Sequence, residues 1–412
     1  MMKWMKLAFR NILRNRRRSF VTIIAVGVGF AAISLYYGYI HNVYNGLRII
    51  AVRGEGLGNL RINRAGWQEK GKLEPEKYMF SNEDTQKIIR LVKEENGVVL
   101  ATPQIQVTGI VTNGIVSTVF IAQGVVPRDD KIIKGRWIEY LPVIGQPLSD
   151  DKRYGVEIAK DLSKYLDLTG GKDGVVMAPT ISGQMNALDI QINGVYDTGN
   201  DFSNDKFMRF NYYFAQSLLD TQSTERIVIL LKNWDETEKM RTLLLKKLTA
   251  AGIDCEIRTW KELSLSFSKQ KAFLDTMFMF LFSIVLIIVL MTTVNTMGMA
   301  ILERTREIGT LRALGLKRKG VSVLFALEGA ILGFFGSLMG VVLHTIAWTV
   351  IKVYPPRYIP PGFSSPVNMY VDMVPLALLI LLLGMILLST VAAIIPARRA
   401  AKQNIVDALG HV

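Results

Sequence analysis

Four long runs of uncharged or nearly uncharged residues constrain the fold of this 412-residue chain more than any other feature. They cover residues 20–40, 276–302, 321–351 and 373–396. Because a helix needs about 20 residues to cross a hydrocarbon core, each run is long enough to span a membrane. Half of the residues are hydrophobic, more than a soluble protein of this size needs. The sequence therefore predicts a membrane protein with four transmembrane helices.

The net charge of +14 is concentrated in three short segments beside these runs. Residues 1–18 carry +7, residues 303–319 carry +4, and the tail from Arg398 carries +2. Positive charge marks the cytoplasmic side of a membrane protein, so both termini and the 303–319 segment are expected in the cytoplasm. A nucleic-acid-binding protein would instead need a basic face on a folded domain, so no nucleic-acid partner is expected.

The first run is interpreted as an uncleaved anchor, because it is longer than a signal-peptide core of 7–15 residues. The expected order is a basic amphipathic N-terminus, a first span, a large exported domain, a second span, a cytoplasmic helix, a third span, an exported loop, a fourth span and a cytoplasmic tail. Their predicted bounds are 1–18, 19–41, 42–272, 273–302, 303–320, 321–351, 352–372, 373–396 and 397–412.

The exported segment alternates between strand and helix patterns, which predicts an α+β domain inserted between the first and second spans. Helices are expected over 81–97 and 233–252, where each begins at a capping-box spacing. Strand, helix and strand from 226 to 260 predict a split βαβ unit. Strands are expected over 60–63, 104–112, 117–125, 174–179, 188–197, 226–232 and 255–260.

No catalytic or metal-binding pattern is found in the sequence of this domain. The three histidines lie at its edge or outside it, and the chain has no Cys/His metal spacing and no phosphate-binding G-x-x-x-x-G-K-[ST] loop. The Asp129-Asp130 and Asp150-Asp151 pairs are interpreted as solvated turn residues. We therefore expect no enzyme activity, metal or cofactor in this chain, and any ATP and Mg must be bound by another chain.

The segment 301–320 has the pattern of one amphipathic helix. Ile308, Leu311 and Leu314 follow a helical spacing and form one apolar stripe. Two interpretations remain open: an interfacial helix held by membrane lipids, or a docking element for a cytoplasmic partner. The charged residues expected to spread over the remaining surface include Arg304, Arg306, Glu307 and Arg312.

Several motifs in the same order resemble the MacB/FtsX family of ABC transporter permeases. "ERTREIGTLRALG" (303–315) is similar to its cytoplasmic coupling motif, with Leu316 where the family has Ala. "GAILGFFGSLMG" (329–340) is similar to its third span, and "PARRAAKQNIVDALG" (396–410) to its closing segment, with Ile405 where Pro is frequent. "LAFRNILRNRRRSFVT" (7–22) and, more loosely, "AQGVVPRDDKIIKGRW" (122–137) fit as well.

The resemblance implies two permeases, as homodimer or heterodimer, paired with two copies of a cytoplasmic ATPase that binds ATP and Mg. ATP-driven closure would move the exported domains, and the 27 uncharged residues of the second span, about 40 Å of helix, fit such a lever. A periplasmic substrate or adaptor protein and membrane lipids are the other expected partners. The expected ATPase-coupling residues are Glu303, Arg304, Arg306, Glu307, Ile308, Leu311, Arg312 and Leu314.

The third span carries two G-x-x-x-G pairs and one acid. Such glycines let helices approach closely, either across a permease dimer or against the first or fourth span of the same chain. Glu328 needs a partner inside the span, and a base of the 303–320 segment is expected. The residues assigned to this packing or dimer site are Glu328, Gly329, Gly333, Gly336 and Gly340.

A stand-alone permease without a fused ATPase resembles the lipoprotein-releasing branch in layout. The sequence therefore predicts a multi-pass protein of a bacterial inner membrane that extracts or moves lipoprotein or another amphipathic envelope substrate. Two alternatives remain: efflux of drugs or peptides through a periplasmic adaptor, and a membrane-anchored sensor or scaffold that controls a cell-wall hydrolase.

Overall fold

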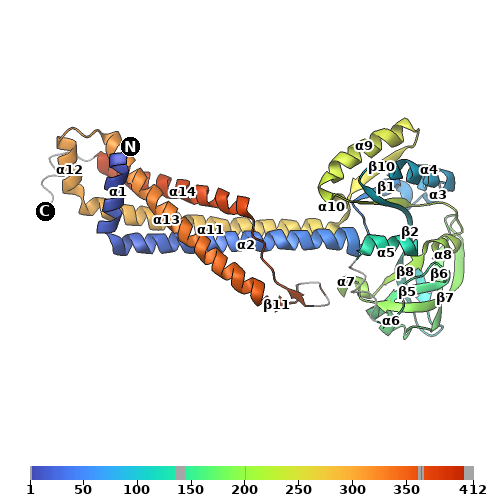
Figure 1. Cartoon of the computed structure of the whole chain (residues 1–412). Helices are drawn as coiled ribbons and strands as arrows, with labels where there is room; N and C mark the ends of the chain where they lie inside the picture. Colours follow the sequence, from blue (N-terminus) through green and yellow to red (C-terminus); the bar gives the residue numbers. More distant parts are fainter. Residues whose placement is uncertain (1, 136–143, 200, 361–362, 364–365, 403–412) are drawn as a thin grey trace. The chain divides into compact units, whose positions relative to one another are not determined.

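The computed structural model describes residues 2–135, 144–199, 201–360, 363 and 366–402. The chain forms two compact units, whose elements Figure 1 shows in chain order. The helical unit comprises Met1–Tyr44, Lys271–Arg357 and Asn368–Val412, and the α/β unit comprises Asn45–Gln270 and Tyr358–Val367. The last part of the closing motif, including Ile405, lies outside the described residues.

Among the described residues, four helices are long and apolar enough to cross a membrane: α2, α11, α13 and α14. The helices and strands that lie wholly or partly in the helical unit are α1 (Met2–Arg14), α2 (Arg16–Ile49), α11 (Leu265–Glu303), α12 (Thr305–Ala313), α13 (Arg318–Val353), β11 (Arg357–Tyr358), β12 (Val367–Asn368) and α14 (Pro375–Ala401).

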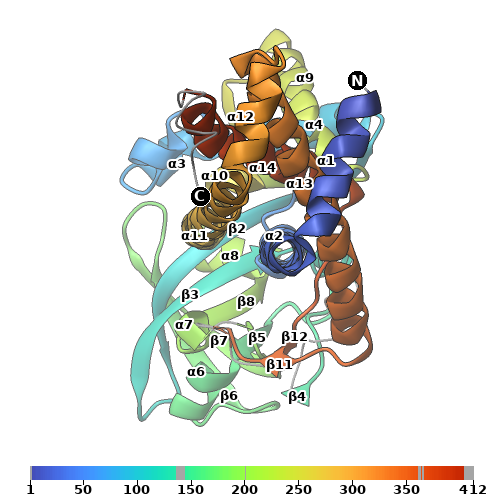
Figure 2. The same ribbon diagram turned by 90° about the vertical axis from the view of Figure 1, so that its left-hand side faces the viewer.

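The basic N-terminus forms a helix of its own, α1, which lies crosswise to α2 (Figures 1 and 2). The chain turns at Asn15, whose backbone N–H donates to the carbonyl of Ile12. One face of α1 packs on α13, where the rings of Phe9 and Phe335 lie tilted to each other with their centroids 6.3 Å apart. Ala8 on α1 is fully buried. Ala8 and the partly buried Ile12 therefore face the protein, whereas Met5, Leu7, Phe9 and Leu13 are 38–58% exposed.

Two glycines of α13 bring it against α2. A Cβ atom on Gly336 would lie 2.6 Å from the Val26 Cβ, and one on Gly340 would lie 2.6 Å from the Phe30 Cβ. Real Cβ atoms do not approach so closely, so only glycine permits this contact. Val26 and Phe30 are fully buried in it.

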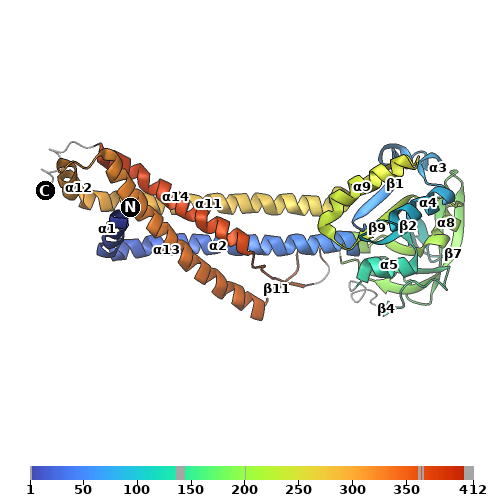
Figure 3. The same ribbon diagram turned by 45° about the horizontal axis from the view of Figure 1, so that its top comes forward.

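The other two glycines of α13 bring it against α14, which lies beside it (Figure 3). Cβ atoms on Gly329 and Gly333 would lie 2.6 Å from the Ser389 carbonyl oxygen and 2.9 Å from the Ser389 Cβ. All four glycines of the two G-x-x-x-G pairs therefore make intramolecular contacts, which is the second of the two uses that the sequence left open. α13 is the central helix of this bundle.

The α/β unit is built from one large mixed sheet and short helices. Its strands are β1 (Leu60–Arg64), β2 (Val98–Thr112), β3 (Ser117–Val125), β4 (Ile144–Gly145), β5 (Gly155–Ala159), β6 (Asp173–Pro179), β7 (Met185–Tyr196), β8 (Phe207–Asn211), β9 (Arg226–Leu231) and β10 (Cys255–Thr259). Its helical elements are η1 (Ile50–Gly54), η2 (Trp67–Gly71), α3 (Pro75–Tyr78), α4 (Asn82–Lys93), α5 (Pro127–Lys134), α6 (Lys160–Tyr165), α7 (Asp201–Asn204), α8 (Tyr212–Leu218), η4 (Trp234–Glu236), α9 (Thr237–Ala250) and α10 (Trp260–Leu263).

The strand pairings divide this sheet into two parts. β2, β3, β8, β5, β7 and β6 pair in sequence, and β6 returns to β2, so these six strands close a ring around one apolar core. β10, β1 and β9 extend the sheet beyond β2, with β1 antiparallel to both neighbours. β9, α9 and β10 therefore form the predicted split βαβ unit, and a second core lies between these strands and helices α4 and α9. The predicted fold class is confirmed: four apolar helices, with an α+β domain inserted after the first.

Three strands of this sheet, β4, β5 and β8, and one acid differ from the sequence-based prediction. β5 and β8 were not predicted, because each is short and carries a charged residue that breaks the apolar pattern. Glu157 on β5 and Arg209 on β8 are register partners and pair through Glu157 Oε2 and Arg209 Nη1, 2.6 Å apart. Asp130 was interpreted as a solvated turn residue, which is wrong. It lies on α5, is 4% exposed and also pairs with Arg209.

Candidate coupling surface

The charged segment between the second and third spans folds as a short helix between two turns. The prediction of one helix over 301–320 is therefore wrong: α11 ends at Glu303, α12 covers Thr305–Ala313, and α13 begins at Arg318. The first break lies at Arg304, the non-helical N-cap residue of α12. The second includes Gly315, which has φ of +98°, a conformation that only glycine adopts readily.

The residues of the predicted apolar stripe face different ways, one toward the helix bundle and two toward the outside. Ile308 is buried in a core cluster with Met297 and Val321, so it holds α12 on the helix bundle. Leu311 is 38% exposed and Leu314 is 81% exposed. Because α12 ends at Ala313, Leu314 is not held on the face of Ile308. The three residues therefore do not form one stripe, and two of them remain available to a partner.

Arg304 was expected on the surface of the segment, and its side chain instead turns into the bundle. Its Nη1 lies 3.1 Å from the Oε1 of Glu328, and both side chains are only 4% exposed. Its Nη2 donates to the carbonyl of Asn11 at 2.9 Å, and the Asn11 side-chain amide donates to the same Glu328 oxygen at 2.7 Å. Glu328 thus has as partner a base of the 303–320 segment, and α1, the break after α11 and α13 meet at one buried polar junction.

Two further ion pairs join the segment to the N-terminal helices. Arg18 Nη1 on α2 lies 2.5 Å from Glu303 Oε1 at the end of α11. Arg14 Nη1 on α1 lies 2.8 Å from Glu307 Oε1 on α12. The hydrogen bond from Arg14 lowers the pKa of the Glu307 carboxyl. Both pairs are about half exposed, so each contributes little alone and they act together with the buried junction.

Four residues remain on the outer side of α12, and we name them the coupling surface after the role that the sequence predicts: Arg306, Leu311, Arg312 and Leu314. Arg306 is exposed and Arg312 is half-buried. Of the eight coupling residues predicted from the sequence, these four line this surface. Glu303, Arg304, Glu307 and Ile308 serve to fix it to the bundle.

The sequence-based prediction missed the residues of the N-terminus that hold this surface: Asn11, Arg14 and Arg18. Their signal was present, because seven bases without an acid precede the first span and two acids stand in the 303–320 segment. These bases were used only to predict membrane topology, and their ion pairs with the acids of the 303–320 segment were not considered. Across the parts of the chain that the structure describes, no cluster of three His, Cys, Asp or Glu side chains could hold a metal ion.

Comparisons with known proteins agree with these features. A family described as FtsX-like permease C-terminal matches residues 278–405. An uncharacterised ABC transporter permease of Methanocaldococcus jannaschii is 23% identical over 98% of this chain and 96% of its own length. The lipoprotein-releasing system transmembrane protein LolC of Neisseria meningitidis is 23% identical over 99% of this chain and 98% of its own.

Among solved structures, the periplasmic region of MacB from Actinobacillus actinomycetemcomitans matches with a TM-score of 0.35 and 14% identity, covering 53% of this chain and 95% of that region. The family match includes α12, with its coupling surface, and the glycines of α13. The resemblance to the MacB/FtsX family of ABC transporter permeases is thus confirmed, with residues 278–405 matching the FtsX-like permease C-terminal family.

Proposed function

We propose that this chain is the permease subunit that transmits the motion of a separate cytoplasmic ATPase to its α/β unit on the far side of the membrane. The observation that carries the proposal is the coupling surface, where Leu311 and Leu314 are exposed on a short helix fixed to the bundle. Exposed apolar side chains beside charged ones are typical of a protein docking site. We propose that they insert into a cleft of the ATPase.

The contacts behind this surface give a route for force. Arg18 and Glu303 connect the start of α2 to the end of α11, and Arg304 and Glu328 connect the next residue to α13. A displacement of α12 therefore acts on three spans at once. α2 has 34 residues and α11 has 39, about 51 and 59 Å of helix, against a hydrocarbon core of about 30 Å. Both helices are long enough to act as levers beyond the membrane.

The partners of this mechanism are part of the proposal. Two ATPase copies would bind ATP and Mg, and a second permease, identical or related, would complete the assembly in a bacterial inner membrane. Both termini and α12 would be cytoplasmic, as the charge distribution indicates. The α/β unit would engage a periplasmic substrate or adaptor protein.

For the substrate, we propose lipoprotein or another amphipathic envelope molecule. This proposal is supported by the relative named as a lipoprotein-releasing system transmembrane protein, which matches nearly the full length of both chains.

The test is co-purification from the native membrane with an ATPase assay of the eluate. The parent chain is compared with the double variant Leu311→Asp/Leu314→Asp. The matched control is Leu73→Asp/Ile115→Asp, which changes two apolar residues of the α/β unit that are 83% and 91% exposed. Ile308 is left unchanged, because it is buried and its replacement would unfold α12.

The proposal predicts that an ATPase accompanies the parent and the control, and that at least 90% of it is lost from the coupling-surface variant. Correct membrane insertion of all three proteins is checked by protease accessibility. If no ATPase accompanies the parent, or if the coupling-surface variant retains it, the coupling role is wrong. A sensor or a lipid-bound helix would then explain the segment better.

A further inference from the structure

Helix α1 keeps an exposed apolar strip beside the face that packs on the bundle. Met5, Phe9 and Leu13 follow one another at intervals of four residues and are 51%, 45% and 58% exposed. This spacing places them along one side of the helix. Ala8 and Ile12, on the neighbouring side, face the protein. The strip is therefore available to a partner.

The strip lies next to the exposed surface of a membrane span. The ring centroid of Phe9 lies 6.3 Å from that of Phe335 on α13, whose side chain is 38% exposed. A Cβ atom on the adjacent Gly336 would lie 3.3 Å from the carbonyl oxygen of Ile23, which is in the second turn of the predicted first span. Because α1 lies crosswise to α2 (Figures 1 and 2), it follows the bilayer surface at this end of the spans.

Basic side chains border the strip on its other side. Lys6 and Arg10 each follow a strip residue, about 100° further round the helix, and both are exposed. Arg16 and Arg17, where α2 begins, are exposed as well. None of these four bases forms an ion pair within the described part of the chain, and residues 1–18 contain no acid. The four charges therefore attract an anionic surface.

An apolar strip bordered by bases fits a bilayer that contains anionic lipid. A helix in the membrane interface buries its apolar side among the upper acyl chains and keeps its bases at the level of the headgroups. Lysine and arginine at this level are attracted by anionic headgroups. A soluble protein, in contrast, would have to displace the lipid around Phe335 in order to cover Phe9.

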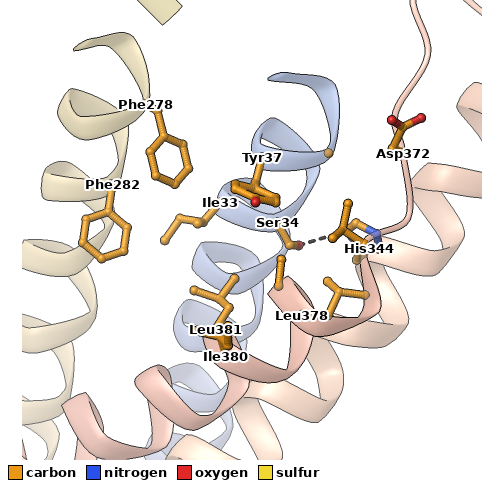
Figure 4. A pocket seen from close by; sticks show the side chains of 13 residues that line it. Ile33, Ser34, Tyr37, Phe278, Phe282, His344, Asp372, Leu378, Ile380 and Leu381 are labelled. Carbon is orange, nitrogen blue, oxygen red and sulfur yellow. Dashed lines mark hydrogen bonds between the residues drawn. The ribbon is translucent and has the colours of Figure 1, made fainter. Parts of the chain in front are cut away.

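The cavity among the spans lacks the charges that would bind such a headgroup. It has a volume of about 270 Å³, and in its wall Ser34 Oγ lies 2.9 Å from Nδ1 of His344 (Figure 4). The described residues that line it include one acid, Asp372, and neither lysine nor arginine. The charges that select an anionic lipid are therefore those of α1 and the start of α2.

We propose that α1 and the start of α2 form a docking surface for anionic phospholipid of the cytoplasmic leaflet. The strip enters the upper acyl region, and the four bases bind the phosphates. The inference rests on the four membrane spans and does not depend on coupling to an ATPase. Bound lipid would also support the coupling segment, because Asn11 and Arg14 on α1 contact Glu328 and Glu307.

The test uses the full chain in liposomes of phosphatidylcholine with one third phosphatidylglycerol. Cys255→Ser removes the single native thiol, and Leu13→Cys then carries the fluorophore NBD within the strip. Quenching is measured with phosphatidylglycerol and with phosphatidylcholine that carry a doxyl group on the same upper acyl carbon. The ratio of the two quenching efficiencies reports which lipid lies beside the strip.

Two double variants are compared in this labelled background. Lys6→Gln/Arg10→Gln removes the bases beside the strip, and both positions are exposed, so the fold is retained. The matched control, Lys317→Gln/Lys319→Gln, removes the same charge from exposed positions that follow α12. Size-exclusion profiles establish that each protein is folded.

We expect phosphatidylglycerol to quench at least three times more per mole than phosphatidylcholine in the labelled parent and in the control. The ratio should fall to near one in Lys6→Gln/Arg10→Gln, and high salt should lower it in the parent. Equal quenching by both lipids in the parent, or an unchanged ratio in Lys6→Gln/Arg10→Gln, would overturn the proposal. Quenching by aqueous iodide instead of lipid would show that the strip faces the cytosol, and no quenching by either would show that a second copy of the chain covers it. Both of these outcomes also contradict the proposal.

Discussion

We predict that Glu328→Leu destabilises the helical unit by about 3–5 kcal/mol, because it leaves the Arg304 charge buried without its carboxylate. The two side chains are each 4% exposed, and the N–O distance is 3.1 Å. Arg304 cannot easily turn toward water, since its Nη2 also donates to the carbonyl of Asn11. Its Nε has no hydrogen-bond partner among the described residues, so the guanidinium depends on these two contacts.

The magnitude follows from charge and distance. At 3.1 Å and an effective dielectric constant of about 20, the attraction is on the order of 5 kcal/mol. The cost of burying Arg304 persists after the substitution, so most of this attraction is lost without compensation. Replacing both partners by apolar residues, in Arg304→Met/Glu328→Leu, removes that cost as well. The double variant should therefore be within about 1–2 kcal/mol of the parent.

The assay is an SDS-unfolding titration of the detergent-solubilised chain, with helicity followed by circular dichroism. The parent, the two single variants and the double variant form a double-mutant cycle. Glu303→Gln is the control, because it removes an exposed pair with Arg18 and should change stability by less than about 1 kcal/mol. A coupling energy for Arg304 and Glu328 below about 0.5 kcal/mol would refute the argument, since it would mean that the pair does not act as a unit.

Two further predictions concern packing and pH. Gly340→Ala should destabilise the helical unit by about 1–3 kcal/mol, because the added Cβ would overlap Phe30. The control is Gly384→Ala on α14, whose added Cβ has no atom within 4 Å. In the same SDS titration this variant should be as stable as the parent or more stable. Burial lowers the pKa of Lys134 from its ordinary 10.5 to about 8. Between these two pH values the unfolded chain holds a proton that the folded chain has lost. The free energy of unfolding of the α/β unit should therefore rise by up to about 3 kcal/mol as the pH rises from 8 to 10.5. In guanidinium titrations followed by Trp fluorescence, Lys134→Met should make the free energy of unfolding nearly independent of pH over this range. If the variant shows the same pH dependence as the parent, Lys134 is not the group that titrates.

Much of the fold could be predicted because its signals are local. The apolar runs identify all four spans, and every one of the seven predicted strands is present. The start of α4 follows from its capping spacing, and the Ser81 hydroxyl accepts from the Asp84 backbone N–H at 3.0 Å. Each of these features depends on residues a few positions apart, which a single sequence displays directly.

The missing strands β5 and β8 depend on partners that are distant in sequence. A strand that carries Glu157 or Arg209 has the pattern of an exposed or irregular segment when it is considered alone. The two side chains are buried only because the sheet places them opposite each other, 52 residues apart. The buried Asp130 has the same explanation, since its partner is also Arg209. Such pairs cannot be identified from composition or periodicity.

The sequence predicted a helical, amphipathic segment between the second and third spans, but not its breaks or the directions of its side chains. Helical spacing puts Ile308, Leu311 and Leu314 on one side, but spacing cannot tell where a helix of nine residues begins and ends. At the break, the side chain of Arg304 pairs with Glu328, which lies on the next span. Only tertiary contacts therefore separate the residue that faces the bundle from those that face outward.

These contacts also bear on the two interpretations that the sequence left open for the segment. The two acids of the segment form ion pairs with Arg14 and Arg18 of the N-terminal helices. The remaining exposed charges of the segment are basic and include Arg306 and residues 317–319. Anionic lipid and an acidic cleft of a protein would both attract such a surface. The leucines distinguish them. A lipid-bound helix holds its apolar residues on one face against the bilayer, whereas here Ile308 is used by the bundle and Leu311 and Leu314 are not. The division of the stripe therefore favours a protein partner that binds the leucines.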